Sequence, residues 1–261
     1  MSIVEALKLI SLGLLCGFLS ATLGIGGGVI LVPALVFLLG YHMKKAVSTS
    51  LSTIIPTTLV ALLTHYLIQG GHFQFLLAAL ITLGALFGAK FGAQLVHQIS
   101  THRLTRLFSL LLIVTGLKLA GALSVSADTG TVSTTPPLLV SLGLATGTLS
   151  ALFGVGGGVI VVPALNMLFG LPLKDAMTIS LLVILPTACA GVFFHRKFNN
   201  VDSGALKTLV PAAALGAVIG TFVSPHIPAD ALKQILGFFL VLTATLMIVQ
   251  HKIKSKTPTV A

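Results

Sequence analysis

The stretch Gly24-Ile25-Gly26-Gly27-Gly28-Val29-Ile30-Leu31-Val32-Pro33 has a second copy, Gly154-Val155-Gly156-Gly157-Gly158-Val159-Ile160-Val161-Val162-Pro163. Each copy places four glycines in five positions, although a glycine inside a helix costs about 1 kcal/mol relative to alanine. Glycine instead permits unusual backbone conformations and a close approach of N–H groups to a small ligand. The apolar run after each cluster predicts the start of a helix, whose unpaired N–H groups and dipole favour an anion. Close helix packing in a membrane would explain one copy, but two copies favour a paired functional element.

The two copies belong to a longer internal repeat. Residues 17–65 align without gaps with residues 147–195, and 24 of the 49 positions are identical. The matched pairs outside the glycine clusters include Ser20/Ser150, Pro33/Pro163, Gly40/Gly170, Ser50/Ser180, Pro56/Pro186 and His65/His195. We therefore divide the chain into a first membrane repeat (1–123), an inter-repeat loop (124–136), a second membrane repeat (137–251) and a basic cytoplasmic tail (252–261).

The composition indicates the class of protein. Of the 261 residues, 56% are hydrophobic and only 8% are charged, and the mean hydropathy is +1.10. Such a chain is expected to be an all-α polytopic membrane protein, and its apolar runs are too long for barrel strands. The net charge of +10 comes from bases in short loops and the tail, so we expect a lipid bilayer and not nucleic acid as the partner.

Each half is predicted to begin with a short hairpin. The second apolar segments, 29–40 and 159–170, have twelve residues each and reach only about 18 Å, less than a hydrocarbon core of about 30 Å. We expect each to form, with the segment before it, a re-entrant or half-helix hairpin with the glycines at its tip. Three transmembrane helices should follow in each half, at 46–68, 74–95 and 104–123 and at 176–194, 206–223 and 232–250.

The basic residues predict the orientation. If the chain reverses direction at each glycine cluster, twelve of the 15 lysines and arginines fall on one side of the membrane and three on the other. The positive-inside rule prefers this distribution over the nearly even one that continuous spans would produce. The prediction is a multi-pass protein of the plasma (cell inner) membrane with both termini cytoplasmic and with two repeats of inverted topology.

Inversion would bring the two tips together near the middle of the membrane, where the N–H groups of both tips could converge on one small ligand between them. Irregular backbone is tolerated at that depth only if it is buried or lines a cavity. Prolines just past each tip leave the carbonyls of Val29 and Val159 without a helical N–H partner. Nearby hydroxyls could complete the hydrogen bonds of an oxyanion, or could simply bond to their own helix. The predicted substrate-binding residues are Gly24, Gly26, Gly27, Gly28, Val29, Pro33, Ser50 and Thr53, and Gly154, Gly156, Gly157, Gly158, Val159, Pro163, Asn166 and Ser180.

Histidines and acids refine this hypothesis. Apart from lysine, His65 and His195 are the only ionisable residues that match between the repeats. We interpret them as gating or proton-sensitive residues, and the alternative is that they are histidines at the membrane interface. All five acids lie at chain ends or in loops, so the predicted membrane segments contain no carboxylate, which favours an anion over a cation as the ligand. We find no nucleophile–base pair or metal-ligand spacing and therefore expect no enzyme activity, catalytic residue, metal or cofactor.

The paired stretches 19–33 and 149–163 resemble the TauE/SafE family of sulfite exporter-like anion permeases, and the resemblance covers nearly the whole chain. It implies a transporter that moves a small sulfur-containing anion, such as sulfite, thiosulfate or an organosulfonate, across the plasma membrane, usually as export. The glycine motifs carry over onto residues 24–28 and 154–158. The alternatives are a carrier for another small anion, a cation carrier, or a non-transporting assembly or sensor protein. The residues do not specify the coupling ion or the oligomeric state.

Overall fold

The computed structural model describes residues 3–69, 74–119, 135–195 and 201–256. These residues form helices and no strand, which confirms the all-α class. The first half contains α1 (Ile3–Leu23), α2 (Gly28–Leu38), α3 (Met43–Gln69), α4 (Phe75–Gln98) and α5 (Thr101–Leu119). The second half contains α6 (Pro136–Phe153), α7 (Gly158–Met167), α8 (Leu173–His195), α9 (Ser203–Val223), the 3-10 turn η2 (Ser224–His226) and α10 (Ala229–Lys256). Most of the expected inter-repeat loop and the last residues of the tail lie outside the described residues.

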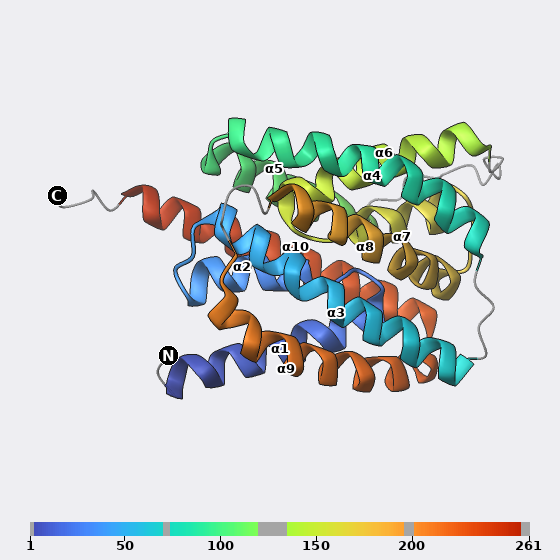
Figure 1. Cartoon of the computed structure of the whole chain (residues 1–261), viewed down its shortest axis with the longest axis horizontal. Helices are drawn as coiled ribbons and strands as arrows, with labels where there is room; N and C mark the ends of the chain where they lie inside the picture. The colour runs from blue at the N-terminus through green and yellow to red at the C-terminus, as the bar shows by residue number, and fades with distance from the viewer. Residues whose placement is uncertain (1–2, 70–73, 120–134, 196–200, 257–261) are drawn as a thin grey trace.

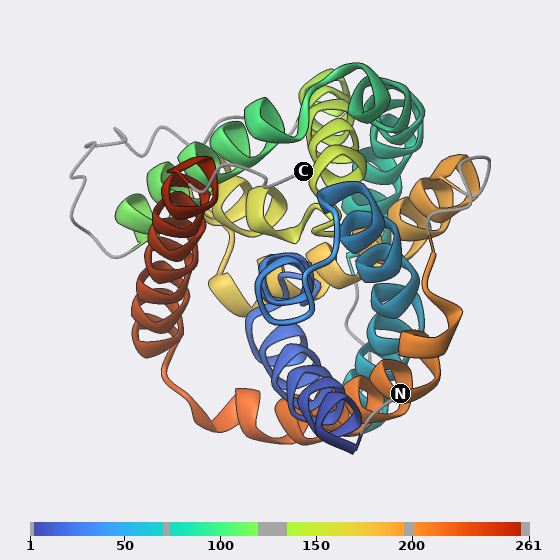
Figure 2. The same ribbon diagram turned by 90° about the vertical axis from the view of Figure 1, so that its left-hand side faces the viewer.

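The helices of the two halves are interleaved. α1 packs along α9, α4 packs along α6, and α5 packs along α10, while α3 and α8 contact each other inside the bundle (Figure 1 and Figure 2). Exchanging the halves converts the α1–α9 pair into the α6–α4 pair and leaves the α3–α8 and α5–α10 pairs unchanged. The packing therefore repeats along with the sequence, and the most extensive helix contacts join one half to the other.

Glycines spaced four residues apart set the closest of these helix contacts. On α4, a Cβ atom added at Gly84 or Gly88 would overlap the carbonyl oxygen of Val140 or Leu144 on α6. In the equivalent helix pair, a Cβ at Gly17 of α1 would overlap the carbonyl oxygen of Ala213 on α9. Small residues at this spacing let two membrane helices approach backbone to backbone.

A short helix follows each glycine cluster, as the sequence predicted, since α2 has 11 residues and α7 has 10. The helices before the clusters are not short: α1 has 21 residues and α6 has 18, and both are long enough to cross a membrane. Glu5 and Leu9 of α1 line the same cavity as Leu39 and Tyr41, which follow α2. The chain therefore turns back at the first glycine cluster toward the end of the molecule where α1 begins.

Six helices among the described residues are long and apolar enough to cross a membrane, namely α1, α3, α4, α6, α8 and α9. The expected segments 104–123 and 232–250 do form helices, α5 and α10, but these are not among the six. In α5 the first turns carry Arg103 and Arg106, which shorten its apolar stretch. Large apolar side chains such as Phe87 and Phe91 on α4 and Leu215 and Phe222 on α9 are exposed, as expected for surfaces that face lipid.

Candidate functional site

The glycine clusters adopt a backbone that other residues rarely reach. Gly26 and Gly27 have φ values of 82° and 64°, and their counterparts Gly156 and Gly157 have 80° and 88°. Gly24 and Gly154 also have positive φ. A side chain in this left-handed region costs roughly 1–2 kcal/mol per residue, so the conformation itself requires glycine. α2 and α7 then begin at the last glycine of each cluster.

The two tips lie in direct contact. A Cβ atom at Gly28 would overlap the carbonyl oxygen of Gly154, and one at Gly158 would lie 2.6 Å from the carbonyl oxygen of Gly24. The same added atoms would lie 3.0 Å from Ile54 Cδ1 and 2.9 Å from Ile184 Cδ1, respectively. Backbone and isoleucine side chains therefore fill the space between the tips, where the sequence suggested a shared ligand.

Ser50 and Ser180 link each half to the tip of the other. The Ser50 hydroxyl donates a hydrogen bond of 2.7 Å to the Gly154 carbonyl oxygen, and the Ser180 hydroxyl donates one of 2.8 Å to the Gly24 carbonyl oxygen. Both serines are fully buried. Because a hydroxyl has one hydrogen, neither serine has a donor left for an anion in this structure. Their substrate-binding role stays a prediction, and the role that the structure displays is to brace the tips.

The tips keep several N–H groups free. The N–H groups of Ile30 and Leu31 both bond the Gly27 carbonyl, and their counterparts Ile160 and Val161 bond Gly157. Among the described residues, the N–H groups of five tip glycines form no hydrogen bond: Gly26, Gly27, Gly156, Gly157 and Gly158. Buried N–H groups without partners are rare in proteins and cost about 1–3 kcal/mol each. They are therefore candidates to bind an anion at a helix N-terminus.

A small cavity lies beside the first tip, on the side that faces α1. It has a volume of about 10 Å³ and is lined in part by Cys16, Gly26, Gly27, Thr53 and Thr57. This volume is about that of one water-sized probe. The Thr53 and Thr57 hydroxyls donate to the carbonyls one turn back in α3, which is the local alternative that the sequence left open for such hydroxyls.

The remaining predicted substrate-binding residues are distributed along the half-helices. Val29 and Val159 are buried in their first turns, and Pro33 and Pro163 lie inside α2 and α7. Asn166 lies at the far end of α7, where its amide donates a hydrogen bond of 2.8 Å to the Leu171 carbonyl. This bond supports the loop that follows α7, and Asn166 is therefore not brought to the tip.

Of the two predicted gating histidines, the structure describes the side chain of one, His65. His65, near the end of α3, places Nε2 3.1 Å from the Thr178 hydroxyl at the start of α8, so it joins the two halves. His195 is the last residue of α8, and its side chain lies outside the described part of the chain. The gating role of both residues stays a prediction.

A polar cluster that sequence reasoning missed joins the halves at the opposite end of α3. Asp202 accepts a hydrogen bond of 2.7 Å from the Tyr41 hydroxyl and pairs with the Lys45 ammonium at 2.8 Å. Its backbone N–H donates to the Thr49 hydroxyl. Its other carboxylate oxygen caps α9 by accepting the N–H groups of Gly204 and Ala205. The sequence signal was an acid directly before a helix, which predicts the cap but not its partners.

The charges of this cluster reinforce one another. Hydrogen bonds from Lys45 and Tyr41, with the N–H of Ala205, hold the pKa of the Asp202 carboxyl well below its usual range. Burial, and then the bond to Asp202, raise the pKa of Tyr41 well above its ordinary value. Since the lowered pKa belongs to an acid, its contribution to stability is present above the unfolded pKa of about 4 and is lost as the pH falls below it.

We expect Asp202→Asn to lower the stability of the protein slightly, because asparagine still caps α9 but no longer pairs with Lys45. The two side chains are 24% and 42% exposed, so the coupling in a Lys45→Gln, Asp202→Asn double-mutant cycle should be about 1 kcal/mol or less. Thermal unfolding in detergent measures it. The difference from wild type should be constant between about pH 5 and 8 and shrink below about pH 4. A difference that grows on acidification would contradict this assignment.

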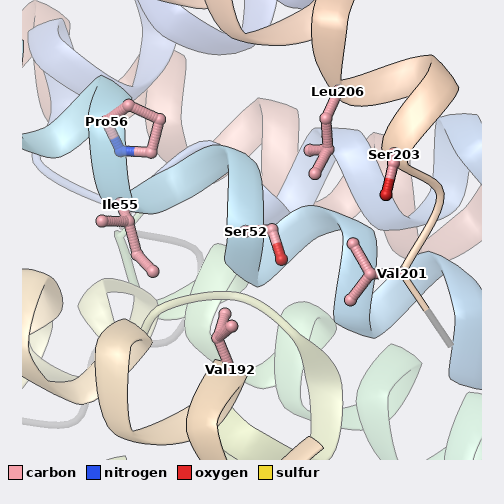
Figure 3. Close-up of a pocket in the computed structure, with 7 residues that line it drawn as sticks. All are labelled: Ser52, Ile55, Pro56, Val192, Val201, Ser203 and Leu206. Carbon is pink, nitrogen blue, oxygen red and sulfur yellow. The ribbon is translucent and has the colours of Figure 1, made fainter. Parts of the chain in front are cut away.

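A larger cavity lies on the other face of α3. It has a volume of about 410 Å³ and is bounded by α3, α8 and the first residues of α9. Figure 3 shows Ser52, Ile55 and Pro56 on one side of this cavity, with Val192 and Ser203 across from them. α3 therefore separates it from the small cavity that Thr53 and Thr57 line beside the first tip.

Long apolar helices, interleaved halves and a pair of buried glycine tips define a multi-pass membrane protein of the transporter class. The family model of sulfite exporter TauE/SafE matches residues 2–119 and 139–261, and the chain belongs to that family.

Two relatives are similar over most of their length, and both are named "probable membrane transporter protein". The one from Methanocaldococcus jannaschii is 29% identical over 258 residues, covering 90% of this chain and 94% of the relative. YunE of Bacillus subtilis is 26% identical over 258 residues, with the same coverage. No solved structure matches the chain.

Proposed function

We propose that this protein moves a small sulfur-containing oxyanion, of the sulfite, thiosulfate or organosulfonate class, across the plasma membrane, in the direction of export. The observation that carries the proposal is the pair of buried tips whose glycine N–H groups have no partner among the described residues. Such groups at the start of α2 and α7 favour a negative ligand. The family name and the relatives' names support transport, and the donor chemistry supports an anion.

Alternating access is the mechanism that the packing favours. The tips, the bracing serines and the helix pairs all occur twice, in equivalent positions of the two halves. We interpret the halves as inverted repeats with both termini cytoplasmic, so that exchanging their conformations opens the site to one side and then the other. Pro56 in α3 and Pro186 in α8 interrupt helical hydrogen bonds and are candidate hinges.

The larger cavity is the proposed route to the first tip. Residues of α3 line both this 410 Å³ space and the small cavity at Gly26 and Gly27. A bend of α3 at Pro56 would connect the two spaces. The Tyr41–Lys45–Asp202 cluster, which holds the start of α3 against the start of α9, would have to loosen for this movement.

Flux into proteoliposomes tests the proposed function. The purified wild-type protein should transport sulfite or thiosulfate with saturation, and Gly27→Leu with Gly157→Leu should reduce the flux about tenfold or more, because the side chains displace the tip N–H groups. The matched control is Gly40→Leu with Gly170→Leu. Those glycines also have positive φ but face open space, so they carry the backbone strain without crowding a tip.

The outcomes separate the hypotheses. Equal flux in wild type and in the tip variant would contradict the site, and an equal loss in the control would show that strain alone explains the effect. Wild-type protein that moves no sulfur oxyanion would contradict the function and favour an assembly or sensor role. Flux of a metal or amine that ignores sulfite would favour a cation carrier.

A further inference from the structure

The hydroxyls of Ser20 and Ser150 are buried without a partner. Each residue is 1% exposed, and neither Oγ atom has a hydrogen-bond partner. Leaving a buried hydroxyl unsatisfied costs about 1–3 kcal/mol, so such groups are uncommon and need an explanation. Here the feature occurs at the same position of both repeats, which an accident of packing would not produce. Among the described residues, one other buried hydroxyl has no partner, that of Thr58. The equivalent position in the second repeat is an alanine, Ala188, so this feature is not repeated.

Both serines lie beside the glycine tips, on α1 and α6. A Cβ atom added at Gly27 would lie 3.4 Å from Ser20 Cβ, and one added at Gly157 would lie 3.6 Å from Ser150 Cβ. Gly27 and Gly157 are among the glycines whose N–H groups have no hydrogen bond in the described residues. Each tip therefore has backbone N–H groups without a hydrogen bond and an unpartnered hydroxyl close to one another. No carboxylate lines the small cavity beside the first tip.

The two faces of each tip differ in chemistry. The inner face presents the carbonyls of Gly24 and Gly154 to the opposite half, where Ser180 and Ser50 satisfy them. The outer face, toward α1 or α6, has the unpartnered hydroxyls of Ser20 and Ser150, although the helix carbonyls of Cys16 and Thr146 also lie there, 3.0 and 3.5 Å from Cβ atoms added at Gly27 and Gly157. An anion needs donors, and an unpartnered hydroxyl beside the tip supplies one, so the outer face is the one suited to an oxyanion.

We infer that Ser20 and Ser150 are substrate-binding residues, and that each completes an oxyanion site on the outer face of its own tip. The inference rests on the proposed function and deepens it, because it replaces one position between the tips with two equivalent positions flanking them. In this structure the small cavity that Gly26 and Gly27 line beside Ser20's helix has only about 10 Å³, so binding an oxyanion next to Ser20 requires α1, α2 and α3 to separate there. The first site also presents Cys16 and Thr53 where the second repeat has Thr146 and Val183.

The test compares two serine pairs that differ in what their hydroxyls do. In Ser20→Ala with Ser150→Ala, we expect the KM for sulfite or thiosulfate to rise about ten- to a hundredfold, the range for a lost hydrogen bond to a charged ligand. The melting temperature should stay the same or rise, because an unsatisfied hydroxyl leaves the interior. In Ser50→Ala with Ser180→Ala, the melting temperature should fall, because two buried carbonyls lose their donors, whatever happens to the KM.

Each result decides the inference. An unchanged KM in the Ser20/Ser150 variant, in wild-type protein that does transport the anion, would overturn the inference and leave the proposed function standing. A lower melting temperature with an unchanged KM would assign these serines a structural role and would also overturn it. Wild-type protein that transports neither anion would instead defeat the proposed function. As an independent measurement, sulfite should raise the melting temperature of the detergent-solubilised wild type more than that of the variant.

Discussion

Gly28→Ala together with Gly158→Ala is expected to abolish transport and to destabilise the protein by about 3 kcal/mol or more. The added methyl groups would overlap or closely crowd the carbonyl oxygens of Gly154 and Gly24. Overpacking usually costs about 1–3 kcal/mol, and backbone atoms cannot relieve the clash by changing rotamer. The two tips would have to separate, which would break the reciprocal bonds from Ser50 and Ser180.

Thermal unfolding in detergent and anion flux in proteoliposomes measure the two effects. Gly40→Ala with Gly170→Ala is the control, since an added Cβ there meets nothing within 4 Å. In the control, alanine is strained because Gly40 and Gly170 have positive φ. Gly28 and Gly158 are not among the glycines with positive φ, so backbone strain does not explain a larger loss in the tip variant. If the tip variant is as stable and active as the control, the tips are not in contact in the working protein.

The second large effect is expected at the helix pairs. Gly17→Ala with Gly147→Ala should destabilise the protein by about 3 kcal/mol or more, because each new methyl group would overlap a backbone carbonyl, that of Ala213 on α9 or of Ala85 on α4. Without a hydrophobic driving force between helices in lipid, close backbone packing supplies much of the association energy. Forcing the pairs apart therefore removes a main source of stability.

Gly191→Ala is the matched control for this prediction. Gly191 also lies inside a helix, α8, but the atoms nearest to an added Cβ belong to the Leu51 side chain, the closest at 3.1 Å, and this side chain can move. Alanine is the better helix former by about 1 kcal/mol, so this variant should be nearly as stable as wild type or more stable. Unfolding by heat or by added SDS provides the comparison, and equal losses at Gly191 and at Gly17/Gly147 would refute the close-packing explanation.

Much of this architecture could be predicted from the residues because it depends on local properties. Apolar length predicted helices that cross a membrane, and the recurrence of 17–65 as 147–195 predicted two equivalent halves. The glycine clusters predicted a special backbone, and the positive φ values confirm it. The short segments after the clusters predicted the half-helices α2 and α7.

The chemistry between the halves could not be read in the same way. Ser50 and Ser180 look like ligand residues in the sequence, yet their hydroxyls bond the tip of the opposite half. Ser20 and Ser150 were not among the predicted substrate-binding residues, yet their buried hydroxyls have no hydrogen-bond partner. Asp202 was expected only in a loop, and it binds Tyr41 and Lys45 from the other repeat.

The residue pattern alone therefore established the class of protein, the duplication and the need for glycine at the tips, since each follows from hydropathy, identity or allowed φ within a short stretch. Which serines brace the tip carbonyls and which keep an unpartnered hydroxyl is settled by how the two halves pack. The reason is that this choice depends on contacts between residues more than a hundred positions apart, such as Ser50 with Gly154. A side chain's helical face can be derived from spacing, but its partner across the bundle is set by how the two halves pack.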